Sequence, residues 1–247
     1  MTEEIFSTDA YRRTAEASVV AVDLAPDHPR VALDRTVCYP GGGGQPHDLG
    51  TLTTPDGTFT VVEVRREGGH VWHTLDATAA AVPAPGTLVE VGVDWARRHL
   101  LMRTHTALHV LCGVIWADFH VAVTGGNMTP GEGRLDFELD AMSAELGQRA
   151  ERRVNEEIAR AREILVAFVS RADAAGDDAL IRTKADLIPA SVDPLRVIDI
   201  VGLDKQADGG THVATTAEVG RVRVLKTESK GRANKRIKLA VEDASAE

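Results

Sequence analysis

The sequence predicts an α+β protein in two parts, with a boundary near residue 93. Up to that point, short β segments alternate with Pro, Gly and Asp residues. Beyond it, two long stretches carry apolar residues at helical spacing, and further strand-like segments follow. A chain of 247 residues is long enough for two ordinary domains. We therefore expect an all-β domain over 1–93 and an α+β domain over 94–247.

The N-terminal part is predicted to be built from strands alone. Strands at this spacing predict a small barrel or a sandwich. The segments with strand character are SVVAVDL, RVALDRTVCY, LGTLTT, TFTVVEVRR, HVWHTL and TLVEVGVD.

The C-terminal part begins with a predicted buried helix over 95–119. Its apolar residues, among them Leu101, Leu108 and Leu111, recur every three to four positions, as they do on the packed face of a helix. Asp94 precedes the helix and can cap its N-terminus.

The remaining segments mix turns, strands and one more helix. The helix is amphipathic, with Leu165 on its apolar stripe. The basic hairpin at the end is marked by two strand-like segments around a short turn. In order, we expect a glycine-rich turn at 124–133, a strand at 134–139, a helix from Asp140 to Ala167, a strand at 195–203, a loop at 204–212 and the hairpin at 220–241.

The composition is that of a soluble globular protein, with 43% hydrophobic and 26% charged residues. The N-terminus has no signal-peptide pattern, and no stretch approaches the roughly 20 apolar residues that cross a bilayer. Cys38 and Cys112 lie far apart, without metal or redox spacing. We expect a cytoplasmic protein with no membrane partner.

Charge is distributed unevenly along the chain. The net charge of −9 argues against nonspecific coating of nucleic acid. Yet the segment from Arg221 to Lys238 contains eight basic residues and a single acidic residue, Glu228. This asymmetry suits a protein that contacts a polyanion with one end. The alternative is a solvated hairpin near the C-terminus.

Two histidines in the predicted helix have the spacing of a metal-binding pair. His105 and His109 are four residues apart, so their rings project from the same face. Neutral imidazole is a common zinc ligand, and a rigid helix loses little entropy when both rings close on an ion. The alternative is a pair that is merely tolerated on a partly buried helix.

A downstream loop can supply two more ligands. In QADGGTH, Asp208 and His212 flank a Gly-Gly turn that lets the backbone aim both side chains at one point. An ordinary turn with an exposed histidine is the alternative. A set of nitrogen and oxygen ligands is harder than the cysteine-containing sets of structural zinc sites, and it favours a Lewis-acidic catalytic ion.

Cys112 shares the helix face of the two histidines, but it is expected to belong to the core. From residue 105 to 112 a helix rises about 10 Å, which is too far for one tetrahedral ion to contact both residues.

A run of four glycines, Gly41–Gly44, lies in YPGGGGQPHD. Such a loop exposes backbone N–H groups and admits a substrate close to the main chain. It lacks the lysine and the strand-to-helix setting of a phosphate-binding loop, so a flexible turn is the alternative.

Together, five segments resemble the AlaX family of trans-editing proteins and the editing domain of alanyl-tRNA synthetase, with a more distant likeness to that of threonyl-tRNA synthetase. They occur in family order across nearly the whole chain. The matching segments are CYPGGGGQPHDLG, RTHTALHVL, GRLDFEL, QADGGTHVATTAEVG and KGRANKRIKLAV.

The resemblance implies a zinc-dependent deacylase. Such an enzyme hydrolyses the ester that joins a wrong amino acid, usually serine and sometimes glycine, to alanine-specific tRNA. It also implies a small N-terminal β-barrel domain followed by a two-layer α/β editing domain that carries zinc. Because no segment resembles an aminoacylation core, editing is expected to occur in trans.

Site residues carry over by position in the matching segments. The implied zinc ligands are His105, His109, Asp208 and His212. The implied substrate-binding residues are Gly41, Gly42, Gly43, Gly44 and Gln45. The basic hairpin supplies the implied tRNA-binding residues Lys226, Lys230, Arg232, Lys235 and Arg236.

Two positions depart from the family pattern. The family commonly has cysteine where this chain has Asp208, which either binds zinc through oxygen or orients a histidine from outside the ligand set. Threonine often begins the glycine-rich loop, where this chain has Gly41. No general base stands out, and Gln45, His47 and Asp48 lie nearest the expected site.

Two other functions remain open from sequence. One is a zinc-stabilised tRNA-binding module without hydrolase activity. The other is a deacylase that acts on another aminoacyl-tRNA or on a small aminoacyl ester.

Overall fold

The computed structural model is mixed α+β, as predicted, and it forms two compact units. Unit 1 contains residues 1–42 and 46–99, and unit 2 contains residues 43–45 and 100–247. The described residues are 1–24, 28–76, 82–141, 143–174, 192–229, 231 and 234–243.

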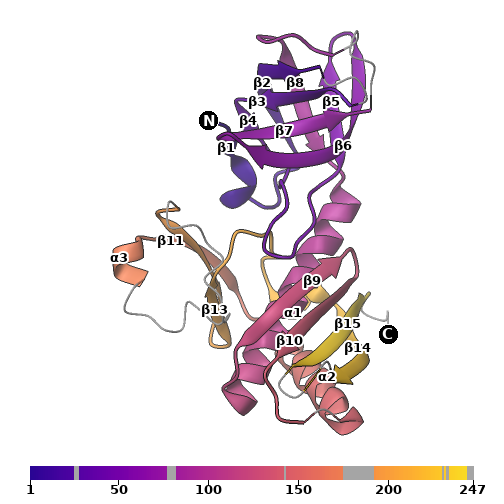
Figure 1. Cartoon of the computed structure of the whole chain (residues 1–247), viewed down its shortest axis with the longest axis vertical. Helices are drawn as coiled ribbons and strands as arrows, with labels where there is room; N and C mark the ends of the chain where they lie inside the picture. Colours follow the sequence, from indigo (N-terminus) through magenta and orange to yellow (C-terminus); the bar gives the residue numbers. More distant parts are fainter. Residues whose placement is uncertain are drawn as a thin grey trace. The chain divides into compact units, whose positions relative to one another are not determined.

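Unit 1 contains a closed barrel of strands in the order β2-β3-β7-β6-β5-β8 (Figure 1). All of its strand pairs are antiparallel. Each segment of residues 1–93 that was predicted to be a strand contributes a strand to unit 1. Of the two predicted architectures, the barrel is the one observed. The barrel strands are β2 (Thr14–Asp23), β3 (Arg30–Leu33), β5 (Gly50–Thr54), β6 (Gly57–Glu67), β7 (His70–Leu75) and β8 (Leu88–Val93).

The barrel encloses a core of aliphatic side chains. Residues along β7 alternate between buried and half-buried positions, which is the period-two pattern of a strand with one face inward. Two short strands, β1 (Glu3–Glu4) and β4 (Arg35–Thr36), pair in parallel in the same unit. The barrel core includes Val19, Val31, Leu33, Leu52, Val61, Val64, Val71, Leu75 and Val91.

A buried ion pair closes the base of the glycine-rich loop in unit 1. The side chains of Arg98 and Asp48 have no exposed surface, and Arg98 Nε donates to both Asp48 oxygens at 3.1 and 3.0 Å. Arg98 Nη2 donates to Val37 O at 2.6 Å, and the Tyr39 N–H donates to Asp48 Oδ2 at 2.6 Å. Removing one partner of a buried pair typically costs about 3–5 kcal/mol. Asp48 therefore holds the two ends of the loop together.

Helix α1 (Trp95–Phe119) matches the predicted helix. The Arg97 N–H donates to Asp94 Oδ1 at 3.2 Å, so Asp94 caps the helix as predicted. The helix is long and apolar enough to span a bilayer, but 78% of its most apolar window is buried inside the protein. This burial is typical of a core helix.

Unit 2 contains a four-stranded antiparallel sheet in the order β14-β15-β10-β9. Strands β14 (Arg221–Ser229) and β15 (Lys235–Glu242) form the predicted basic hairpin, and β10 (Glu132–Phe137) is the predicted strand near 134–139. The prediction of a glycine-rich turn at 124–133 was wrong, because β9 (Val123–Thr129) occupies most of it. Gly126 lies opposite Leu135, whose side chain fills the space that a Cβ would need.

Helix α2 (Ala144–Ala159) covers the edge strand β14. Ser143 caps its N-terminus by accepting the Leu146 N–H at 3.1 Å. Asn155 exchanges two hydrogen bonds with the main chain of Val222, at 2.7 and 2.9 Å. These bonds satisfy backbone groups at a sheet edge that would otherwise be open.

The predicted helix from Asp140 to Ala167 was too long. Helix α2 ends at Ala159, Ala161 has a positive φ of 50°, and residues Ile164–Val169 form strand β11. The apolar sequence ILVAFV pairs with another strand, so long-range pairing overrides the local helical pattern. Leu165, placed on the helical stripe, is 44% exposed.

A second antiparallel sheet of unit 2 has the order β11-β12-β13. Strand β12 (Leu195–Ile200) confirms the strand predicted at 195–203. Strand β13 (Asp204–Ala207) occupies the first part of the segment predicted as a loop, so the loop itself begins at Asp208. The short helices are α3 (Arg171–Ala174) and η4 (Thr216–Val219), with η1 (Ile5–Ser7) in unit 1.

Candidate metal centre

Helix α1 presents two buried imidazoles from one face. His105 is 5% exposed and His109 is 8% exposed. Their ring centroids lie 5.0 Å apart with the planes nearly perpendicular. The four-residue spacing therefore places both rings one helical turn apart, as predicted.

The loop after β13 is held in place by Arg196 of β12. Arg196 Nη1 donates to Asp208 O at 2.9 Å and to Gly210 O at 2.7 Å. The Asp208 N–H donates to Arg196 O at 3.0 Å. These bonds fix the main chain on both sides of Gly209, so the side chains of Asp208 and His212 have defined directions.

The structure brings all four predicted ligands together. One donor atom from each of His105, His109, Asp208 and His212 lies within 4.8 Å of the others. His212 Nε2 is 3.2 Å from Asp208 Oδ2, and His105 Nε2 is 3.7 Å from Asp208 Oδ1. Ligands about 2.0–2.2 Å from a tetrahedral zinc ion are roughly 3.4 Å from one another. The residues present therefore fit a single divalent ion.

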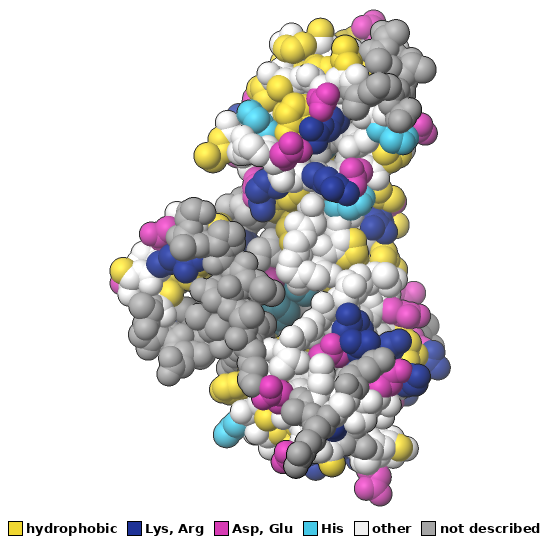
Figure 2. Space-filling model, in the orientation of Figure 1, with side chains coloured by type: hydrophobic (Ala, Val, Ile, Leu, Met, Phe, Trp, Pro, Cys, Tyr) yellow, Lys and Arg dark blue, Asp and Glu magenta, His cyan; other side chains and the backbone are white. Residues whose placement is uncertain are grey.

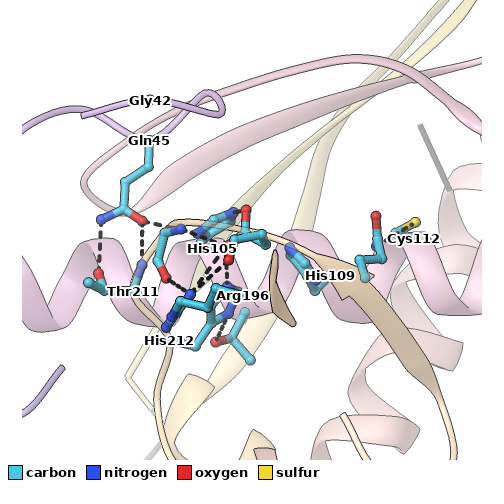
Figure 3. A network of polar contacts seen from close by, with 12 residues as sticks. Gly42, Gln45, His105, His109, Cys112, Arg196, Thr211 and His212 are labelled. Carbon is cyan, nitrogen blue, oxygen red and sulfur yellow. Dashed lines mark hydrogen bonds and ion pairs between the residues drawn. The ribbon is translucent and has the colours of Figure 1, made fainter. Parts of the chain in front are cut away.

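Two of the imidazoles contact polar side chains through Nδ1 (Figure 3). His105 Nδ1 is 3.0 Å from Gln45 Oε1, and His212 Nδ1 is 3.1 Å from Thr106 Oγ1. Partners of this kind, on the ring nitrogen away from the metal, orient the imidazole and set its tautomer in metal sites.

The third imidazole is held by a carboxylate. His109 Nδ1 lies 3.1 Å from Asp204 Oδ2, whose side chain has no exposed surface. Gln206 Nε2 donates to the same oxygen at 2.7 Å and to Cys112 Sγ at 3.3 Å. Cys112 is buried beside the cluster, as predicted for a core residue. Among the described residues, the cluster of candidate ligands consists of the three histidines and Asp208.

Burial keeps two of the rings uncharged. Desolvation lowers the pKa of His105 to about 4 and lowers the pKa of His212 well below its ordinary value. For His109, burial also acts to lower the pKa, but the hydrogen bond and charge of Asp204 outweigh it and raise the pKa. His105 and His212 are therefore neutral at neutral pH, the form that binds metal.

The sequence did not reveal the contacts of Asp204, Thr106 and Gln206 with this centre. Thr106 directly follows His105 in the chain, and Asp204 precedes Asp208 by four residues. Both spacings are ordinary, and only the pairing of β13 with β12 and the packing against α1 give these side chains their partners.

The glycine-rich run has a backbone that favours glycine throughout. The φ angles of Gly41, Gly42, Gly43 and Gly44 are 81°, 139°, 57° and 89°. All four lie in the region that side chains with a Cβ rarely adopt. A Cβ built on Gly43 would be 3.8 Å from Asp208 Oδ1, so this part of the run lies beside the ligands. Contact of the run with a substrate stays a prediction.

Two of the predicted tRNA-binding residues form ion pairs within the sheet. Lys226 Nζ is 2.6 Å from Glu228 Oε1, and Arg236 Nε is 2.7 Å from Asp136 Oδ1. The hydrogen bond from Arg236 holds the pKa of Asp136 below its ordinary value, although burial acts against this. Figure 2 shows basic side chains beside acidic ones over the region of β10, β15 and β14.

Of the other three predicted tRNA-binding residues, Lys235 is the first residue of β15. Lys235 is buried, and its Nζ donates to Gly231 O at 2.7 Å. Lys230 and Arg232 lie outside the described residues.

Two family models match the chain. The model described as threonyl and alanyl tRNA synthetase second additional domain matches residues 195–238, which include Asp208 and His212. The model described as tRNA synthetases class II (A) matches residues 10–97, which include the barrel.

Curated relatives match almost the whole chain. The alanyl-tRNA editing protein AlaX-M of Saccharolobus solfataricus is 34% identical over 241 residues, covering 96% of this chain and 98% of the relative. The AlaX-M protein of Methanosarcina barkeri is 34% identical over 246 residues, covering 98% and 100%. The alanine–tRNA ligase of Methanococcus vannielii is 33% identical over 231 residues, which cover 92% of this chain but 24% of the ligase.

A Gly210→Ala substitution is expected to weaken metal binding, probed with zinc, by about 10- to 100-fold, the usual effect of disturbing partners of metal ligands. A Cβ on Gly210 would lie 2.4 Å from His105 Cε1 and 2.6 Å from Gln45 Oε1, so the ring must move. Competition with a chromophoric chelator measures the affinity.

Gly209→Ala is the matched control, because a Cβ on Gly209 meets nothing within 4 Å. Equal zinc affinities for the two variants would show that the tight packing of the loop on His105 does not organise the centre.

Proposed function

Because the chain belongs to the AlaX family of alanyl-tRNA editing proteins, we propose that it is a metal-dependent hydrolase that deacylates mischarged tRNA(Ala) in trans. The wrong amino acid on that tRNA is serine or glycine. The observation that carries the proposal is the cluster of His105, His109, Asp208 and His212, whose donor atoms converge from a long helix and a distant loop. The reaction belongs to the cytoplasm, where tRNA is charged.

The extent of the match supports editing in trans. The chain covers nearly the full length of the AlaX-M relatives, but about a quarter of two alanine–tRNA ligases. A protein of this extent corresponds to the part of the ligase that aligns with editing proteins. This likeness to editing proteins supports action on tRNA that another protein has charged.

Zinc is the ion that this ligand set would hold. Three imidazoles and one carboxylate are nitrogen and oxygen donors, and catalytic zinc sites use such donors with a position left open. When bound, the ion supplies Lewis acidity toward an ester carbonyl or lowers the pKa of water. Asp208 would contribute an anionic oxygen. Its Oδ2 accepts the Gly210 N–H at 2.7 Å, and its Oδ1 lies 3.7 Å from His105 Nε2.

The chain's own residues then bind and orient the substrate. The backbone N–H groups of Gly41–Gly44 offer hydrogen bonds to the aminoacyl group. Gly43 lies beside the ligand Asp208. Gly41 carries no hydroxyl that would contact a serine side chain, so the loop contacts the aminoacyl group through its main chain. This favours a site that accepts both serine and glycine esters.

The basic hairpin holds the tRNA through its phosphates. Lys226 and Arg236 lie on its two strands, and Lys235 begins the second strand. Lys230 and Arg232 lie between the two strands in the sequence. Side chains of this kind bind phosphates by charge and position the nucleic acid without reading its bases.

Replacing both helical ligands, as in the His105→Ala, His109→Ala double variant, is expected to slow deacylation of seryl- and glycyl-tRNA(Ala) by at least about 100-fold. Such a loss corresponds to about 2.7 kcal/mol of transition-state stabilisation. Release of the labelled amino acid from mischarged tRNA measures the rate.

His120→Asn is the control for the double variant, because His120 is an exposed histidine with a positive φ that asparagine tolerates. Unchanged rates in the double variant would refute metal catalysis. If the double variant unfolds, and wild type unfolds to the same extent when a chelator removes the metal, the protein would instead be a zinc-stabilised tRNA-binding module.

Lys226→Ala is expected to weaken tRNA binding across all tRNA sequences and to reduce the slope of log K against log salt by roughly 1, because one phosphate contact is lost. Arg65→Ala is the matched control, since Arg65 is an exposed strand residue paired with Glu63 two positions away, as Lys226 is with Glu228. Filter binding at several salt concentrations measures both. The same slope for Lys226→Ala and wild type would show that the hairpin does not belong to the tRNA interface.

A further inference from the structure

We infer that Gln45 is a positioning residue of the metal centre, which fixes the tautomer of His105 and thereby presents His105 Nε2 to the ion. The inference rests on the proposed function, because it concerns the same site. The sequence predicts Gln45 as a substrate-binding residue. The hydrogen bonds of its carboxamide give it this positioning role (Figure 3).

The orientation of the Gln45 carboxamide follows from its contacts with Thr211. The Thr211 backbone N–H points at one polar atom of Gln45 from 3.0 Å. Since a backbone N–H can only donate, that atom is the acceptor, Oε1. The amide nitrogen then faces Thr211 Oγ1, to which it donates at 2.9 Å. Both contacts agree on one orientation of the amide.

This orientation determines which nitrogen of His105 carries the proton. Gln45 Oε1 lies 3.0 Å from His105 Nδ1, and a carboxamide oxygen accepts but never donates. His105 Nδ1 must therefore carry the hydrogen. A neutral imidazole has a single N–H, so His105 Nε2 keeps its lone pair and faces Asp208, 3.7 Å from Oδ1.

The bond between Gln45 and His105 is shielded from water. Gln45 is 2% exposed and Thr211 has no exposed surface. Gly210 packs against the bond so closely that its Cβ would lie 2.5 Å from His105 Nδ1. A hydrogen bond in such surroundings meets little competition from solvent and holds its geometry.

The backbone that carries Gln45 is anchored within unit 2. The Met128 N–H of β9 donates to Gly44 O at 3.2 Å. The segment Gly43–Gln45 thus has a main-chain attachment to the sheet and a side-chain attachment to a metal ligand. By linkage, zinc binding and the order of this segment strengthen one another.

The test compares the zinc affinity of Gln45→Leu and Gln45→Glu by competition with a chromophoric chelator. Leucine has a similar size but no acceptor, so the affinity is expected to fall by about 10- to 100-fold. Glutamate keeps an acceptor for the His105 Nδ1–H, and the Thr211 hydroxyl can turn to donate to it. Gln45→Glu is therefore expected to retain the wild-type affinity.

Gln148→Leu on the exposed face of α2 is the control for the substitution itself. An unchanged zinc affinity in Gln45→Leu would overturn the inference. An equal loss in Gln45→Leu and Gln45→Glu would also overturn it, because the acceptor would then be irrelevant. A raised KM of Gln45→Leu with unaltered zinc affinity would also overturn it, because Gln45 would then contact the substrate directly.

Nitrogen-15 NMR of the imidazoles in the metal-free wild type is a second test. It needs no substitution, so misfolding of a variant cannot affect it. The expected His105 signal is that of a ring with its proton on Nδ1, and a proton on Nε2 would overturn the inference.

Zinc competition and NMR use no tRNA, so they separate the inference from the proposed function. Zinc binding that depends on Gln45, in a wild-type protein that releases no amino acid from tRNA, would contradict the proposed function alone. Active wild type with a zinc affinity indifferent to Gln45 would contradict the inference alone.

Discussion

The candidate metal centre depends on polar contacts that hold each imidazole ring by its Nδ1. His105, His109 and His212 each contact a different polar partner through Nδ1, from an amide, a carboxylate and a hydroxyl. Without these contacts each ring could rotate or change tautomer, and ordering three rings at once would oppose binding. With them, the donor atoms are gathered before any ion arrives.

Secondary structure supplies the positions from which these contacts are made. The long helix α1 places His105, Thr106 and His109 on one buried surface, so it provides ligands and an outer partner together. Strand β13 ends directly before Asp208 and carries Asp204, the partner of His109. Arg196 then fixes the intervening turn through carbonyl oxygens, so the loop needs no core of its own.

The most local features were the easiest to predict from sequence. The spacing of His105 and His109 settles their shared helix face, and the alternation in HVWHTL identifies strand β7. Where local pattern and long-range pairing disagree, the sequence misleads: ILVAFV continues a helical stripe but pairs as β11, and the glycines of TGGNMT suggest a turn but form β9. The partners of the imidazoles were not predictable, because Gln45 and Asp204 meet their histidines only through tertiary packing.

X-ray absorption spectroscopy of the protein loaded with one equivalent of zinc tests the central claim most directly, since it counts the ligand types around the ion. We predict nitrogen and oxygen donors alone, at roughly 2.0–2.2 Å, with the outer-shell scattering of imidazole rings. A sulfur donor at about 2.3 Å would contradict it, because Cys112 would then take the place given to Asp208.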